Sequence, residues 1–234
     1  MIVSGRWRTV DGHQAMRHSA WALAVLALPL WILPQTTGVV LVFDDIVDEF
    51  GEPSFNVDGL HWLGLFVDED DSLIKHVEIS WRRGDVGAAA FQLSTQPTGP
   101  LLLWTGVPQL EAAPAQTILR WTTDLSPINP MTTLQLNEAH YELALRGVDP
   151  GACDAVVILT DGGNSQQLYS LENGQFACDE PHLSVNWAGD LDGDGRLDLV
   201  TTFSRKYSYH PRRMYLSSAA RPGELVGQVA LFER

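Results

Sequence analysis

Residues 187–203, WAGDLDGDGRLDLVTTF, carry the most specific pattern in this chain of 234 residues. Acidic residues occupy positions 1, 3, 5 and 9 of a glycine-containing loop: Asp190, Asp192, Asp194 and Asp198. Carboxylates at alternate positions can all turn inward on one hard cation, and the backbone carbonyl of Arg196, at position 7, can add a ligand. Ca²⁺ takes roughly 6–8 oxygen ligands in forgiving geometry, so the loop predicts a Ca²⁺ site.

A bound calcium ion explains this loop better than the alternatives do. Four carboxylates this close would repel one another strongly without a cation. Mg²⁺ suits the loop less, because it keeps several waters and demands stricter octahedral geometry. Gly195, at position 6, stands where the loop must bend sharply, and we expect a Cβ there to hinder the bend. The remaining alternative is an acidic, solvated Asp-Gly turn that holds no ion.

The segments on both sides of the loop are patterned as strands. Residues 183–187 alternate apolar and polar side chains, and residues 197–203 are β-branched and apolar. An EF-hand needs a helix on each side and a bidentate Glu at position 12, where this chain has Thr201. We therefore expect a strand–calcium loop–strand unit.

Residues 189–200, GDLDGDGRLDLV, resemble the FG-GAP repeat of integrin α-chains and the related bacterial VCBS-type repeats. The resemblance implies calcium ligands at Asp190, Asp192, Asp194 and Asp198 and at the carbonyl of Arg196. The chain has a single such loop, whereas propellers stack about 4–8 blades, so we do not expect a full propeller. The tail from residue 214 to 226 looks more loosely like a group of uncharacterised exported bacterial proteins, a likeness that implies no known activity.

Short alternating runs separated by Pro and Gly fill the rest of the chain. Residues 73–81 and 140–146 alternate cleanly, and Asp161-Gly162 marks a hairpin turn. The predicted fold is mainly β, an antiparallel sandwich or meander that ends in the strand–calcium loop–strand unit. We divide it into a β-rich part over 39–150 and a second over 151–234, with one continuous domain as the alternative.

The N-terminal segment, residues 1–38, is predicted to be a signal peptide or an N-terminal anchor. Three arginines precede the uncharged run AWALAVLALPLWIL at residues 20–33. This run is short and contains Pro29, so we expect no integral membrane span. The predicted location is secreted or periplasmic. In the rival interpretation the segment stays on the mature protein as a buried or membrane-tethering helix.

The net charge of the chain limits the kinds of partner that it can bind. A formal net charge of −14 disfavours nucleic acid, whose phosphates require a basic face, and suits cations. The two cysteines leave two possibilities open. In an exported protein Cys153 and Cys178 would form a disulfide, and in a cytosolic protein they would be buried thiols.

No catalytic residue is predicted, because the sequence has no G-x-S-x-G elbow, P-loop or dinucleotide fingerprint. We expect a calcium-stabilised protein with a non-catalytic binding or structural role and an unknown extracellular or periplasmic ligand or protein partner. One alternative is a secreted hydrolase whose catalytic residues are dispersed in sequence. Another is an assembly or adhesion component with an exposed apolar patch.

Further residues have both a plain structural and a functional interpretation. The acidic runs 44–49 and 68–71 are expected to be solvated, with a second cation site as the alternative. The cluster of Tyr207, Tyr209 and His210 is expected to pack, and a ligand groove is the alternative. Four tryptophans are expected in the core rather than in a sugar-binding platform: Trp62, Trp81, Trp104 and Trp121.

Overall fold

The computed structural model describes residues 38–42, 59–68, 71–83, 91–126, 129–147, 153–172, 178, 180–206 and 208–233. They belong to one compact unit, Thr36–Arg234, and form antiparallel strands with a single 3₁₀ turn, η1 (Ser217–Ala219). The mainly β prediction is therefore confirmed. The predicted signal peptide or anchor lies, except for Gly38, outside the described residues. Among the residues that the structure describes, no helix is both long and apolar enough to cross a membrane.

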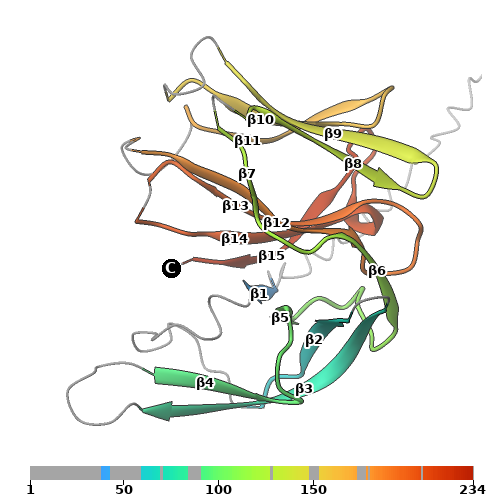
Figure 1. The fold of residues 1–234 in the computed structure, drawn as a ribbon, viewed down its shortest axis with the longest axis vertical. Helices are drawn as coiled ribbons and strands as arrows, with labels where there is room; N and C mark the ends of the chain where they lie inside the picture. Colours follow the sequence, from blue (N-terminus) through green and yellow to red (C-terminus); the bar gives the residue numbers. More distant parts are fainter. Residues whose placement is uncertain are drawn as a thin grey trace, which may run out of the picture. The chain divides into compact units, whose positions relative to one another are not determined.

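The larger sheet curls into a nearly closed ring (Figure 1). Along the ring the strand order is β1-β5-β2-β3-β6-β12-β13-β14-β15, and β4 and β7 branch from β3 and β12. Gly38 closes the ring onto β15: its N–H donates to the Val229 carbonyl at 2.9 Å, and its carbonyl accepts from Leu231 at 2.8 Å. The strands of this ring sheet are β1 (Val39–Val42), β2 (Trp62–Val67), β3 (Ser72–Arg83), β4 (Phe91–Gln96), β5 (Leu102–Thr105), β6 (Pro114–Leu119), β7 (Thr123–Asp124), β12 (His182–Asp190), β13 (Asp198–Ser204), β14 (Arg212–Leu216) and β15 (Gly227–Phe232).

The second sheet is a four-stranded antiparallel meander, here called the meander sheet. Its strands are β8 (Met131–Leu136), β9 (Ala139–Arg146), β10 (Val156–Thr160) and β11 (Ser165–Ser170). The predicted Asp-Gly hairpin turn joins β10 to β11, where Asp161 Oδ1 accepts from the amides of Gly163 and Asn164 at 3.0 and 2.7 Å. A short polar side chain that bonds its own turn backbone explains why this sequence turns here.

Two hydrophobic cores lie on the two faces of β12 and β13. One lies between these strands and the meander sheet, and it includes Leu143, Val157 and Phe203. The other lies inside the ring and includes Trp104, Trp187 and Met214. β12 is buried from Leu183 onward and β13 along its whole length, because side chains that alternate between two faces meet a core on each.

The predicted core tryptophans are only partly borne out. Trp62 and Trp104 are buried, and the side chain of Trp81 lies outside the described residues. Trp121 is 72 % exposed, so its assignment to the core is wrong. It sits between β6 and β7, where the chain leaves one strand before it starts the next.

Cys153 and Cys178 form a disulfide, one of the two states left open by the sequence. The bridge joins the segment before β10 to the segment after β11, across 25 residues. It therefore closes the base of this hairpin.

Reduction of this disulfide is expected to lower the free energy of unfolding by about 3 kcal/mol, because the unfolded chain regains the freedom that the closed loop removes. For a chain of this size the melting temperature would fall by roughly 6–12 °C. Thermal unfolding with and without reductant measures the change, and the Cys153→Ser/Cys178→Ser variant should not respond to reductant. An oxidised and a reduced protein that melt together would contradict the expected role.

Candidate metal centre

The loop predicted to bind calcium joins two strands in the structure. Asp190 is the last residue of β12 and Asp198 the first residue of β13, so we call residues 190–198 the Asp loop. Gly193 and Gly195 have φ values of +76° and +79°, which L side chains rarely adopt. A Cβ at Gly195 would meet nothing nearer than Asn137 Nδ2, at 3.9 Å. Gly195 is therefore required by the positive φ of the backbone at this bend, and not by crowding from neighbouring residues.

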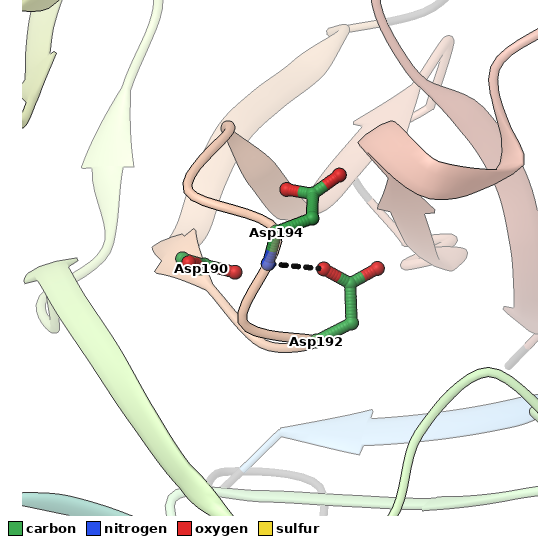
Figure 2. Close-up of side chains that lie close together, drawn as sticks. All are labelled: Asp190, Asp192 and Asp194. Carbon is green, nitrogen blue, oxygen red and sulfur yellow. Dashed lines mark hydrogen bonds between the residues drawn. The ribbon is translucent and has the colours of Figure 1, made fainter.

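Three of the predicted ligands come together in this loop. Each of Asp190, Asp192 and Asp194 offers a carboxylate oxygen that lies within 4.8 Å of the others. Asp190 is buried, Asp192 is half-buried and Asp194 is exposed. Figure 2 shows the three side chains around the bend, with the Asp194 amide donating to Asp192 Oδ1 at 3.3 Å. This group could hold a metal ion.

Backbone amides of the loop fix the direction of the carboxylates. Asp190 accepts from Gly193 N at 2.8 Å through Oδ1 and from Gly195 N at 2.9 Å through Oδ2. Asp194 Oδ1 accepts from Arg196 N at 2.8 Å. A carboxylate has about four lone-pair sites, so an oxygen that accepts one amide proton can still bind a cation. The loop thus orients its oxygens without using up their capacity as ligands.

Arg196 contributes a side chain that the sequence argument did not consider. Its Nε and Nη2 donate to Asp194 Oδ2 at 3.0 and 2.9 Å. Burial raises the pKa of Asp194, but hydrogen bonds from Ser217 and Arg196 together with the Arg196 charge hold it below the usual value. The guanidinium side chain is 55 % exposed, so this pair is weak and could open at little cost. The carbonyl of Arg196 stays a predicted ligand.

Asp198 is fully buried and lies outside the group of three. Its Oδ2 accepts from the Leu191 amide at 2.7 Å and its Oδ1 from the Ser217 amide at 2.8 Å. Burial raises its pKa to about 7 against these hydrogen bonds, and the charges of Asp192 and Asp194 add to the rise. Its role as a ligand remains a prediction, and the structure shows that it ties η1 to the Asp loop.

Three further residues at the loop were missed by sequence reasoning. Ser217 Oγ donates to Asp194 Oδ2 at 2.8 Å, and Ser218 Oγ donates to Asp192 Oδ2. Asn137, in the turn between β8 and β9, donates through Nδ2 to the Gly195 carbonyl at 3.3 Å. These contacts span 23, 26 and 58 residues, so no local spacing could have predicted them.

The other acidic runs give no comparable group among the described residues. Residues 44–49 lie outside those residues, as do Glu69 and Asp70. Asp68 and Asp71 line a pocket of about 230 Å³ beside β6 and are not part of a carboxylate cluster that could hold an ion.

Two larger pockets lie beside the start of β2 and the middle of β3. Their volumes are about 630 and 750 Å³, within the range of about 300–1,000 Å³ that is usual for ligand pockets. Both are lined by His61 and His76. Glu111 lines the first and Glu78 the second, so imidazoles and carboxylates share these hollows.

His210, from the predicted aromatic cluster, packs edge-on against His182 with the ring centroids 5.3 Å apart. Tyr207 lies outside the described residues. Burial lowers the pKa of His182; the Asp124 charge opposes this shift and the Arg212 charge adds to it. The folded protein therefore favours a neutral imidazole at this position.

This lowered pKa predicts a loss of stability in acid. Because the unfolded chain binds the proton more tightly, stability should fall as the pH drops below about 6.5, the ordinary value for histidine. We expect the His182→Gln variant to lose part of this fall when chemical denaturation is measured between pH 7 and pH 5. His140→Gln, at an exposed position, is the control and should follow the wild type. Identical pH dependence in all three proteins would contradict the assignment.

No protein-family model, curated protein or solved structure matches the chain. The geometry alone therefore defines the class. It is an antiparallel β protein in which a ring sheet and a meander sheet bury a hydrophobic core on each face of β12 and β13. A group of three aspartates at a strand–loop–strand junction could hold a metal ion.

Proposed function

We propose that the Asp loop binds Ca²⁺ and that the protein is an exported, calcium-stabilised β protein with a non-catalytic binding or structural role. The observation that carries this proposal is the convergence of carboxylate oxygens from Asp190, Asp192 and Asp194 within 4.8 Å. Repulsion between such groups is costly, and a divalent cation between them turns it into attraction.

The donor set favours calcium over other cations. It consists of oxygens alone, which suit hard ions such as Ca²⁺ and Mg²⁺ rather than zinc or copper. Asp198 and the Arg196 carbonyl would raise the number of oxygens toward the 6–8 or so that Ca²⁺ takes. Burial raises the pKa of Asp198, and a cation bound nearby would oppose that rise by favouring the charged carboxylate.

The position of the loop supports a structural role for the ion. Asp190 and Asp198 end and begin the two strands buried between the cores, and Ser217 and Ser218 bring η1 to the same carboxylates. An ion that binds only the folded form stabilises it by about 2.7 kcal/mol at a hundredfold excess over Kd. The disulfide supports an oxidising compartment outside the cytosol, where calcium sites work at about 10⁻⁴–10⁻³ M.

Thermal unfolding of the full chain in excess Ca²⁺, excess Mg²⁺ and chelator tests the proposal. The expected result is a calcium-selective rise in melting temperature of roughly 5–11 °C relative to the chelated protein. An unchanged melting temperature in calcium would overturn it, and an equal rise in Mg²⁺ would overturn the identity of the ion.

A second candidate function is a secreted hydrolase, and the two pockets that share His61 and His76 favour it. Histidine and glutamate side chains can act as general acids and bases when a pocket presents them to a substrate. Chromogenic ester, phosphate and glycoside substrates should then be turned over by the wild type. His76→Ala should lower that rate by about 100-fold or more, while the exposed control His140→Ala leaves it unchanged. Absence of turnover on all three substrate classes would remove this candidate.

A further inference from the structure

Trp121 is an exposed indole beside a polar pocket. Its side chain is 72 % exposed, although tryptophan is among the costliest residues to leave in water. The guanidinium carbon of Arg120 lies 5.7 Å from the centre of the indole ring, and Arg120 also lines the pocket of about 230 Å³. Trp121 is not itself among the residues that line the pocket, but the cation–π contact places its ring next to Arg120, which is.

The pocket itself is lined by side chains of opposite charge. Asp68 and Asp71 come from the turn between β2 and β3, and Arg120 comes from the end of β6. Gln116 lines the pocket as well, and its amide can both donate and accept. Such a lining suits a neutral ligand with many hydroxyl groups better than an ion of either sign, because each sign of charge meets a repulsive group.

Partly buried hydrogen bonds hold Thr117, one of the residues that line the pocket. Thr117 Oγ1 accepts from Ser72 Oγ at 2.9 Å and from Trp187 Nε1 at 3.1 Å. Trp187 belongs to the core inside the ring and is fully buried. With both acceptor positions of Thr117 in use, its own hydroxyl proton can still donate. The polar groups are thus held in place before a ligand binds.

We propose that Trp121 and this pocket bind one ring of a neutral carbohydrate. A sugar ring has an apolar C–H face that stacks on indole, while its hydroxyl groups act as donors and acceptors in fixed directions. Asp68 and Asp71 accept from hydroxyl groups, Arg120 donates to them, and Gln116 does both. The volume, below the usual range for a drug-sized ligand, fits a single ring while the rest of a chain stays in solvent.

This site uses no residue of the Asp loop. A negative result for sugar binding can therefore be told apart from a negative result for calcium binding. β6 does pair with β12 next to that loop, through Gln116 with Asp190. Binding is therefore measured in excess calcium, in which the Asp loop is saturated if it binds the ion at all. Melting temperature tests the calcium proposal, and sugar affinity tests the carbohydrate proposal.

The experiment is calorimetric titration of the full chain with soluble neutral oligosaccharides of glucose, mannose, galactose and N-acetylglucosamine. We expect at least one of them to bind the wild type and Trp121→Ala to weaken that binding about tenfold. Trp121→Phe, which keeps an aromatic face, should recover most of the affinity. Met131→Ala is the matched control, since Met131 is a large apolar side chain, 44 % exposed, on the separate meander sheet.

Absence of binding by the wild type across the whole panel would overturn the proposal. Equal affinity of the wild type and Trp121→Ala for a sugar that binds would overturn it too. If free glycine or alanine competed with the sugar and Trp121→Ala left the sugar affinity unchanged, the pocket would instead be assigned to a small zwitterion. Melting temperatures of the variants must match the wild type, as expected for exposed positions, so that lost binding reports the site and not the fold.

Discussion

Asp194→Ala is expected to abolish the calcium-dependent rise in melting temperature of the wild-type protein. Asp194 supplies one of the three oxygens that converge in the Asp loop, and its other contacts are to Ser217 and Arg196. Removing one carboxylate from such a set takes away a ligand and a negative charge together. The variant should therefore melt at the same temperature in calcium and in chelator, a loss of the full shift of roughly 5–11 °C.

The calcium-free stability of this variant separates ion binding from simple damage. Alanine removes the pair with Arg196, which is exposed and contributes little, and it also relieves repulsion among the carboxylates. We expect the chelated variant to melt within a few degrees of the chelated wild type. A variant that melted far lower in chelator would show that Asp194 holds the loop by itself, without an ion.

Asp161→Ala is the matched control for this experiment. Asp161 also begins an Asp-Gly turn and caps its own backbone, through Gly163 and Asn164, but it stands outside the group of three carboxylates. Its removal should lower the melting temperature in both conditions and keep the calcium shift intact. An equal calcium shift in the wild type and Asp194→Ala would remove the site assignment, whatever Asp161→Ala does.

The sequence was sufficient for features that depend on local spacing. The alternation of β9 placed Tyr141, Leu143 and Leu145 on one face, and all three are buried. The aspartates at alternate positions predicted the convergence of Asp190, Asp192 and Asp194, because a tight loop with two left-handed glycines leaves few other directions for those side chains. Period and turn chemistry act over a few residues, so a single sequence reveals them.

Features that depend on distant pairing were not accessible in this way. The closure of the ring through Gly38 and β15 joins residues near opposite ends of the described chain. The serines of η1 reach the Asp loop only because β14 follows β13 in the same sheet. Tryptophan is a residue type that usually packs in a core, but Trp121 is exposed because it lies in the link between the end of β6 and the start of β7. Hydrophobicity states what a side chain prefers, whereas topology decides which side chains find a core.

Gly189→Ala is expected to lower the free energy of unfolding by more than about 4 kcal/mol, which is exceptional for a single substitution. A Cβ at this position would lie 1.9 Å from the Gln116 carbonyl oxygen and 2.6 Å from the indole of Trp187. The first contact is with backbone of the paired strand β6, which cannot rotate away. To accommodate the methyl group, β6 and β12 must separate where Asp190 is positioned.

Gly193→Ala distinguishes this crowding from the cost of an unusual backbone conformation. Gly193 has φ +76°, yet a Cβ there would meet nothing within 4 Å, so its replacement should cost only about 1–2 kcal/mol. Equilibrium denaturation of both variants in chelator gives the comparison without any contribution from an ion. A loss at Gly189 no larger than that at Gly193 would mean that β6 and β12 are not packed as closely as the structure has them. The larger loss would show that the approach of these two strands, which only glycine permits, places the first carboxylate of the Asp loop.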